Sequence, residues 1–173
     1  EGFKALGTAQ HYGVDESIVD VEHHGEGCSV GSSAVDGSVD RDAHGQEFTA
    51  HWVVEPGREV NTTLVTEFFN LPFDTRVHYI AVHLHPFAES LELIDRTTGE
   101  TIFRSIARNS EDKIGLEEVE YFSSVEGVPV FKDHEYELVS VYNNTSGENQ
   151  DSMAVMFLYL EDIQFKKPDL GDF

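Results

Sequence analysis

The sequence has little cysteine and few basic residues. Its one cysteine, Cys28, cannot form an intrachain disulfide, and a cysteine-rich zinc site is excluded as well. Eleven Lys and Arg residues stand against 33 Asp and Glu, which gives a formal net charge of −22. Neutralising phosphates requires Lys and Arg, so we expect no nucleic-acid partner. The same charge disfavours docking on anionic membrane surfaces and predicts a solvating acidic surface.

Long hydrophobic runs are absent too. A membrane-spanning helix needs about 20 consecutive apolar residues, so we expect no membrane insertion. The longest apolar run, residues 154–160, has the length of a strand and is apolar on both faces, which predicts a central strand. Hydrophobic residues make up 39% of the 173-residue chain, enough for the core of one domain.

The chain divides into three parts by composition. Residues 1–47 include the Gly- and Ser-rich stretch 25–38 and are expected to form an irregular N-terminal extension. Residues 48–165 are expected to form a β-sandwich domain, and residues 166–173 a C-terminal tail.

An all-β architecture is predicted from residue 48 onward. Short segments rich in Val, Ile, Thr, Tyr and Phe alternate with turn signals at intervals of roughly ten residues. This spacing predicts an antiparallel β-sandwich or jelly roll, with a hairpin at residues 95–100 and a short helix at residues 110–119. The expected strands are 48–54, 60–69, 76–85, 90–95, 101–107, 134–143 and 152–160.

The strongest chemical signal is the triplet His83-Leu84-His85. Residues i and i+2 of a strand share a face, so both imidazoles point the same way at a separation that suits two ligands of one metal. Pro86 follows directly and ends the strand. Met153, at the start of the last strand, offers a thioether, a soft ligand that suits Cu(I). Two His and one Met leave a coordination position open for oxygen or substrate.

The order of these motifs resembles a known family. His83-Leu84-His85, the strand ending at Tyr142-Asn143-Asn144-Thr145, and the segment Gln150-Asp-Ser-Met153 followed by apolar residues are similar to the C-terminal half of the copper type II, ascorbate-dependent monooxygenases, such as peptidylglycine alpha-hydroxylating monooxygenase. The resemblance covers roughly residues 77–160. It implies that copper is the cofactor and that His83, His85 and Met153 are its ligands.

The resemblance is incomplete, which widens the expected function. Those enzymes carry disulfides and a further sandwich domain with a three-histidine copper, whereas this chain has one cysteine and only the pair His23-His24 outside the strands to compare with that site. A copper-binding or copper-transfer module is therefore as compatible as an oxygen-reactive oxidoreductase. Such proteins usually act outside the cytoplasm, so we expect a secreted or periplasmic protein with a redox or copper-donor partner protein.

Two other function classes fit the sequence. A cupin would use His83, His85, Glu89 and His134, a harder set suited to iron, manganese or zinc. A β-sandwich that binds no metal and displays loops to a protein or glycan is the other alternative. The nature of the bound metal separates these possibilities, because sulfur from Met153 is soft and oxygen from Glu89 is hard.

The remaining histidines are weaker ligand candidates. His51, beside Trp52, is either an additional ligand or a packed strand residue, and His134 begins a strand. His78 has the opposite parity to His83 and should face away unless a bulge intervenes. Residues 36–47 space oxygen ligands like a calcium loop but carry Arg41 where that loop needs Gly, so a plain loop is expected.

Overall fold

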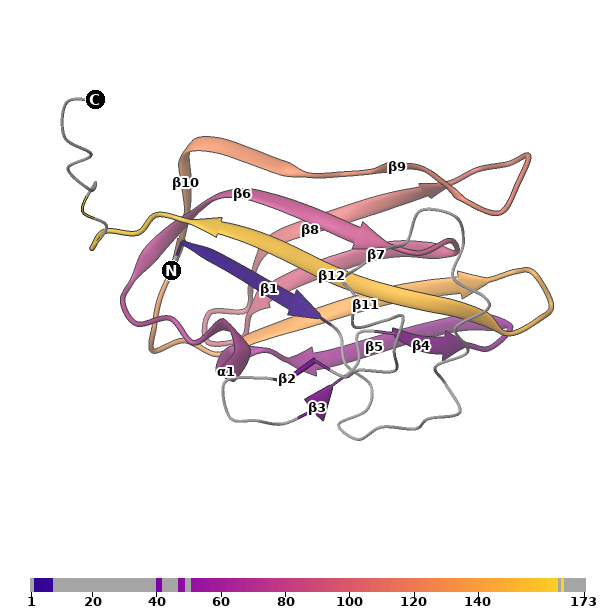
Figure 1. Ribbon diagram of the computed structural model, residues 1–173, viewed down its shortest axis with the longest axis horizontal. Coiled ribbons are helices and arrows are strands. Elements are labelled where there is room, and N and C mark those ends of the chain that lie inside the picture. Colours follow the sequence, from indigo (N-terminus) through magenta and orange to yellow (C-terminus); the bar gives the residue numbers. More distant parts are fainter. Residues whose placement is uncertain (1, 8–39, 42–46, 49–50, 165, 167–173) are drawn as a thin grey trace, which may run out of the picture.

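The computed structural model describes residues 2–7, 40–41, 47–48, 51–164 and 166. Two five-stranded antiparallel sheets face each other, which confirms the predicted all-β sandwich (Figure 1). The first sheet has the order β1-β12-β6-β10, with β4 also paired to β12. Its strands are β1 (Phe3–Gly7), β4 (His51–Val54), β6 (Thr75–Leu84), β10 (Phe122–Val130) and β12 (Gln150–Leu160).

The other sheet has the order β5-β11-β7-β8-β9. A further pair of very short strands, β2 with β3, stands apart from both sheets. The bounds are β2 (Asp40–Arg41), β3 (Glu47–Phe48), β5 (Gly57–Leu64), β7 (Ala88–Asp95), β8 (Glu100–Asn109), β9 (Leu116–Val119) and β11 (Tyr136–Asn144). No described helix is long and apolar enough to cross a membrane.

The core lies between the two sheets and follows the alternation of each strand. Inward side chains of β6 and β12 meet those of β7 and β11, and nearly all are fully buried because successive strand residues point to opposite faces. The side chains that build this interior include Ile80, Leu84, Ala154, Met156 and Leu158 from the first sheet, and Leu91, Leu93 and Leu138 from the other.

Strand β12 lies in the middle of its sheet, as the apolar run predicts. It pairs along one side with β6. Its other side is shared by β4 at the start of β12, where Met153 aligns with His51, and by β1 further along, where Val155 aligns with Gly7. The two short strands therefore form one continuous edge partner for β12 (Figure 1).

The N-terminal boundary differs from the expectation. Phe3–Gly7 is strand β1 and pairs with β12, so the expected irregular segment 1–47 is wrong at its start. The alternation around buried Leu6 explains why this short stretch adds to a sheet edge. The rest of the expected extension, apart from the four residues of β2 and β3, lies outside the described residues, as does nearly all of the expected tail 166–173.

The expected strand 60–69 is two elements. β5 ends at Leu64, and a one-turn helix, α1 (Thr66–Phe69), follows. Asn70 closes it in the left-handed conformation (φ 38°), and its N–H bonds the carbonyl oxygen of Thr66. The turn buries Phe69 while carrying the chain from one sheet to the other, a tertiary requirement that overrides local strand propensity.

The region after β8 also departs from the expectation. The predicted helix 110–119 is a loop followed by β9. The residues of β9 pair with β8, and this pairing satisfies backbone N–H and C=O groups along the edge of β8. β10 was not expected, since Gly127 and Pro129 interrupt its sequence. Pro129 is tolerated because β10 pairs on one side only.

Candidate functional site

His83 and His85 lie side by side at the end of β6. Their ring centroids are 5.4 Å apart and their planes are inclined at 79°. Leu84, between them, is 7% exposed and joins the main core. The expected arrangement is confirmed: alternation turns both imidazoles to the outer face of the sheet.

Met153 lies beside His85 on the neighbouring strand. β12 aligns Ala154 with Leu84 and Val155 with His83. One residue further, the backbone N–H of His85 donates to the Met153 carbonyl oxygen at 3.3 Å, which continues the same register. Side chains directly opposite in an antiparallel pair share a face, with Cβ atoms about 5 Å apart. The register thus places the three expected copper ligands on one face of the sheet, at the adjoining ends of β6 and β12.

Among the described residues, Met153 belongs to a small apolar cluster that is separate from the main core. Met153 and Val155 are 3% and 6% exposed and form a small cluster of their own with Phe157. The outward rows of β6 and β12 pair His85 with Met153, His83 with Val155, Ala81 with Phe157 and Tyr79 with Tyr159. None of these rows contains a carboxylate, although the chain has 33 acidic residues.

Asp151 contacts the ring of His85. Its Oδ2 lies 3.4 Å from Nδ1 of His85, and its backbone carbonyl oxygen lies 3.3 Å from the same nitrogen. Both acceptors favour the tautomer in which Nδ1 carries the hydrogen. In that tautomer the lone pair of the ring is on Nε2.

A buried tyrosine from the opposite sheet reaches the same strand ends. Tyr142, on β11, accepts a hydrogen bond from the His85 N–H (3.3 Å) and donates one to the Met153 carbonyl oxygen (2.5 Å). Its ring packs edge-on against Trp52 with centroids 5.3 Å apart. Burial raises the pKa of Tyr142 to about 12, so its hydroxyl remains protonated at physiological pH.

The weaker candidates separate into different places. The backbone of His51, on β4, aligns with Met153 on the side of β12 that faces away from β6. His51 therefore occupies the same cross-strand row as His85. His78 lies at an irregularity between the pairs of Tyr79 and Val77 with β12, and its Nδ1 is 3.1 Å from the carbonyl oxygen of Ser124. Five residues of strand place His78 roughly 16 Å from His83.

His134 lies at the other end of the sandwich. Its Nδ1 is 2.6 Å from Oδ2 of Asp95, which is 3% exposed. Burial works to raise the pKa of Asp95, but hydrogen bonds from His134 and from the backbone of Thr98 and Thr97 together hold it below its ordinary value. His134 therefore belongs to a structural pair that closes the β7–β8 hairpin.

The cupin ligand set does not come together. Glu89 is on β7, in the other sheet, where Oε2 lies 3.3 Å from Nε of Arg58. His134 is at the end of β6 marked by Thr75, away from His83. Within residues 51–164, which contain all four members of the set, no group of three His, Cys, Asp or Glu residues could hold a metal.

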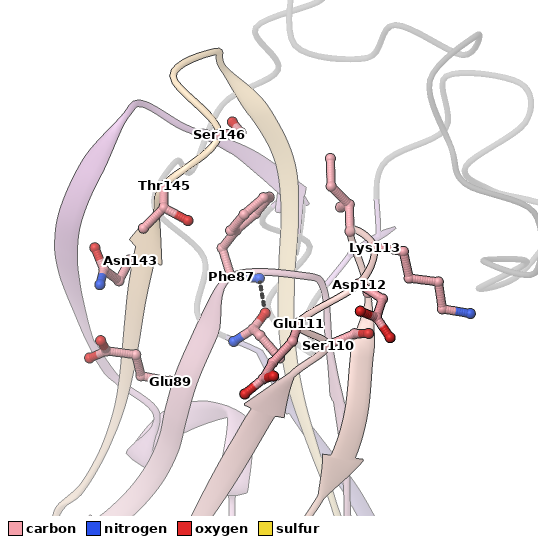
Figure 2. A pocket seen from close by; sticks show the side chains of 12 residues that line it. Phe87, Glu89, Ser110, Glu111, Asp112, Lys113, Asn143, Thr145 and Ser146 are labelled. Atoms are coloured by element: carbon pink, nitrogen blue, oxygen red, sulfur yellow. Dashed lines mark hydrogen bonds between the residues drawn. The ribbon is translucent and has the colours of Figure 1, made fainter.

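A cleft opens near the turn that follows His85. It has a volume of about 610 Å³ and lies between the β8–β9 loop and the end of β11 (Figure 2). Phe87 lines it in the left-handed conformation (φ 71°), which is strained for a bulky residue. Asn109 secures this turn: its Oδ1 accepts from the Phe87 N–H at 2.6 Å and its Nδ2 donates to the Ala88 carbonyl oxygen at 2.8 Å.

Several features of this region give little signal in the sequence. Tyr142 and Asp151 reach His85 across strands, so spacing along the chain does not reveal them, whereas Pro86 marks the turn that leads to the cleft. His23, His24 and Cys28 and most of the expected loop 36–47 lie outside the described residues.

Comparison with protein-family models, with curated proteins and with solved structures found no match.

Proposed function

We propose that this protein binds one copper ion through His83, His85 and Met153. The observation that carries the proposal is the register of β6 and β12, which aligns a thioether with a His-x-His pair on one face. The ring centroids are 5.4 Å apart, close enough for one nitrogen of each ring to reach a shared ion with bonds of about 2 Å, as for zinc.

The chemistry of the neighbourhood favours copper over harder metals. Thioether suits Cu(I) and imidazole suits copper in both oxidation states, while magnesium, calcium and manganese prefer carboxylate, carbonyl or water oxygen. Apart from Asp151, whose carboxylate contacts Nδ1 of His85, the described outward rows of β6 and β12 hold no carboxylate, in a chain where carboxylates are abundant. A site without negative ligands stabilises the ion of lower charge, so we expect a preference for Cu(I).

Asp151 supports the same assignment. Histidines that bind metals usually donate the hydrogen of the other ring nitrogen to a carboxylate or a backbone carbonyl. Asp151 offers both groups to Nδ1 of His85. His85 would therefore bind through Nε2, held in orientation by this contact.

The first experiment measures the metal and its ligands. We expect about one copper per chain, with nitrogen and sulfur scattering in the X-ray absorption spectrum of the Cu(I) form. Met153→Leu roughly conserves volume and should weaken Cu(I) more than Cu(II), because only the sulfur is lost. Met156→Leu is the matched control: Met156 is on the same strand but in the core, so copper affinity should not change.

Histidine variants define the rest of the ligand set. Replacing His83 or His85 by Ala should lower the affinity for both oxidation states, because imidazole serves both. His51→Ala tests whether the residue aligned with Met153 is an additional ligand. His134→Ala, at the other end of the sandwich, should leave copper binding unchanged. Equal loss of Cu(I) and Cu(II) in Met153→Leu would contradict thioether ligation.

The ligand set is compatible with two activities: reaction with oxygen, or binding and transfer of copper to a partner protein. Reoxidation of the Cu(I) protein by air, compared with copper release to a chelating peptide, distinguishes them. Either activity fits a secreted or periplasmic protein, which we propose as the location. A protein that binds no metal would instead favour the interaction-module alternative.

A further inference from the structure

We infer that Tyr142 is the positioning residue of the copper site: its hydroxyl sets the spacing between His85 and Met153. The inference rests on the proposed copper site. Tyr142 does not itself face the ion, because it comes from the opposite sheet and is completely buried in the core. It acts through the main chains of the two residues that carry the ligands.

The Tyr142 hydroxyl lies where the pairing of β6 with β12 ends. β6 ends at Leu84, and the next backbone bond, from the N–H of His85 to the carbonyl oxygen of Met153, is long at 3.3 Å. Tyr142 bonds both of these groups, accepting from the N–H and donating to the carbonyl oxygen. The phenol therefore bridges the strand ends and keeps His85 in register with Met153 one residue beyond the strand.

The bridging ring is held by its own supporting contacts in the core. The edge-on contact with Trp52 fixes the ring, and Trp52 in turn donates from Nε1 to Oε1 of Glu59 at 3.0 Å. Supporting contacts of this kind hold a binding site in its productive geometry.

A second tyrosine on the same strand provides a matched comparison. Tyr136 is also buried, with its pKa raised by burial to about 12, and packs edge-on against Phe69 at 4.9 Å. Its hydroxyl accepts from the Phe131 N–H at 2.7 Å and donates to the Phe131 carbonyl oxygen at 3.0 Å. Each hydroxyl accepts from one backbone N–H and donates to one carbonyl oxygen. Tyr136 makes both bonds to the single residue Phe131, whereas Tyr142 joins His85 to Met153.

The test compares Tyr142→Phe with Tyr136→Phe. We expect similar losses of stability, since each variant removes one buried hydroxyl. Only Tyr142→Phe should weaken Cu(I), by about tenfold, the lower end of the usual effect of losing a group that orients a metal ligand. In the metal-free proteins, the NMR signals of the His85 amide and the Met153 methyl should shift in Tyr142→Phe and not in Tyr136→Phe.

The outcomes separate this inference from the proposed function. If wild type binds no copper, the proposed function fails, and the metal-free NMR arm decides the positioning role alone. Equal copper affinity in the two variants, or an unchanged Met153 methyl in Tyr142→Phe, overturns the inference. If Tyr142→Phe does not fold, fluorotyrosine labelling of wild type replaces it: the Tyr142 signal should move on Cu(I) loading and the Tyr136 signal should not, and the reverse overturns the inference.

Discussion

Asp95 should make a pH-dependent contribution to stability that can be measured directly. Its carboxylate accepts hydrogen bonds from the backbone N–H groups of Thr97 (2.9 Å) and Thr98 (3.2 Å) and contacts Nδ1 of His134 at 2.6 Å. Hydrogen bonds to a charged group contribute about 1.5–3 kcal/mol. Thr97 and Thr98 are exposed, so water can replace the carboxylate there. We therefore expect Asp95→Ala to cost about 2 kcal/mol, or roughly 4–8 °C in Tm.

The sign of the pH dependence follows from the direction of the shift. The folded-state pKa of Asp95 lies below its ordinary value, so the ionised form is the one that stabilises the fold. Its contribution is fully present above the unfolded-state pKa of about 3.9 and is lost as the pH falls through the lower folded-state value. The difference between wild type and Asp95→Ala should therefore be largest near neutral pH and shrink below about pH 4.

Urea unfolding of wild type and variant across this pH range measures the effect. Asp133→Ala is the control, because its side chain is 84% exposed and 3.9 Å from Lys132, so it should change little at any pH. A difference for Asp95→Ala that stays constant between neutral and acidic pH would refute the assignment of the stabilising form. If Asp95→Ala lowers the free energy of unfolding by well below 1 kcal/mol at neutral pH, the estimate of about 2 kcal/mol for these charged hydrogen bonds is refuted.

Three further outcomes follow from other parts of the molecule. Tm should rise with sodium chloride, because a formal charge of −22 repels itself and salt shortens the Debye length to about 3 Å at 1 M; a flat Tm would contradict screening. Gly127→Ala should lower the free energy of unfolding by more than about 1 kcal/mol, because φ is +64° and a Cβ would meet the Val77 carbonyl oxygen at 2.9 Å. A Cβ at Gly147 would meet open space, so Gly147→Ala should lower it less in the same urea assay. Asn109→Ala should destabilise by about 1–2 kcal/mol and release the strained Phe87 turn, seen as a change in its NMR signals; an unchanged turn would show that Asn109 does not hold it.

Alternation made the outward face of β6 predictable. That His83 and His85 point the same way depends on strand geometry alone, and Leu84 between them confirms it by facing the core. The hairpin at residues 95–100 was equally local: Asp95 bonds the N–H groups of the turn, and Gly99 adopts the positive φ that such turns need.

The long-range contacts were not predictable in the same way. Nothing in the spacing aligns Met153 with His85; that expectation came from family resemblance, and the register supplies it physically. The contact of Asp151 with His85 and the bridge from Tyr142 depend on how strands pair and sheets stack, which a single sequence does not specify. The sequence does not predict β10, because Gly127 and Pro129 normally argue against a strand and are tolerated here only at a sheet edge.

The two tyrosines of β11 also stabilise the two ends of that strand separately. Tyr136 ties its strand to the turn at Phe131, and Tyr142 ties it to the strand ends at His85 and Met153. Each tie belongs to a different end of a strand whose middle is buried. Local openings at the two ends should therefore have independent free energies, so that amide hydrogen exchange at His85 can quicken while exchange at Phe131 stays unchanged.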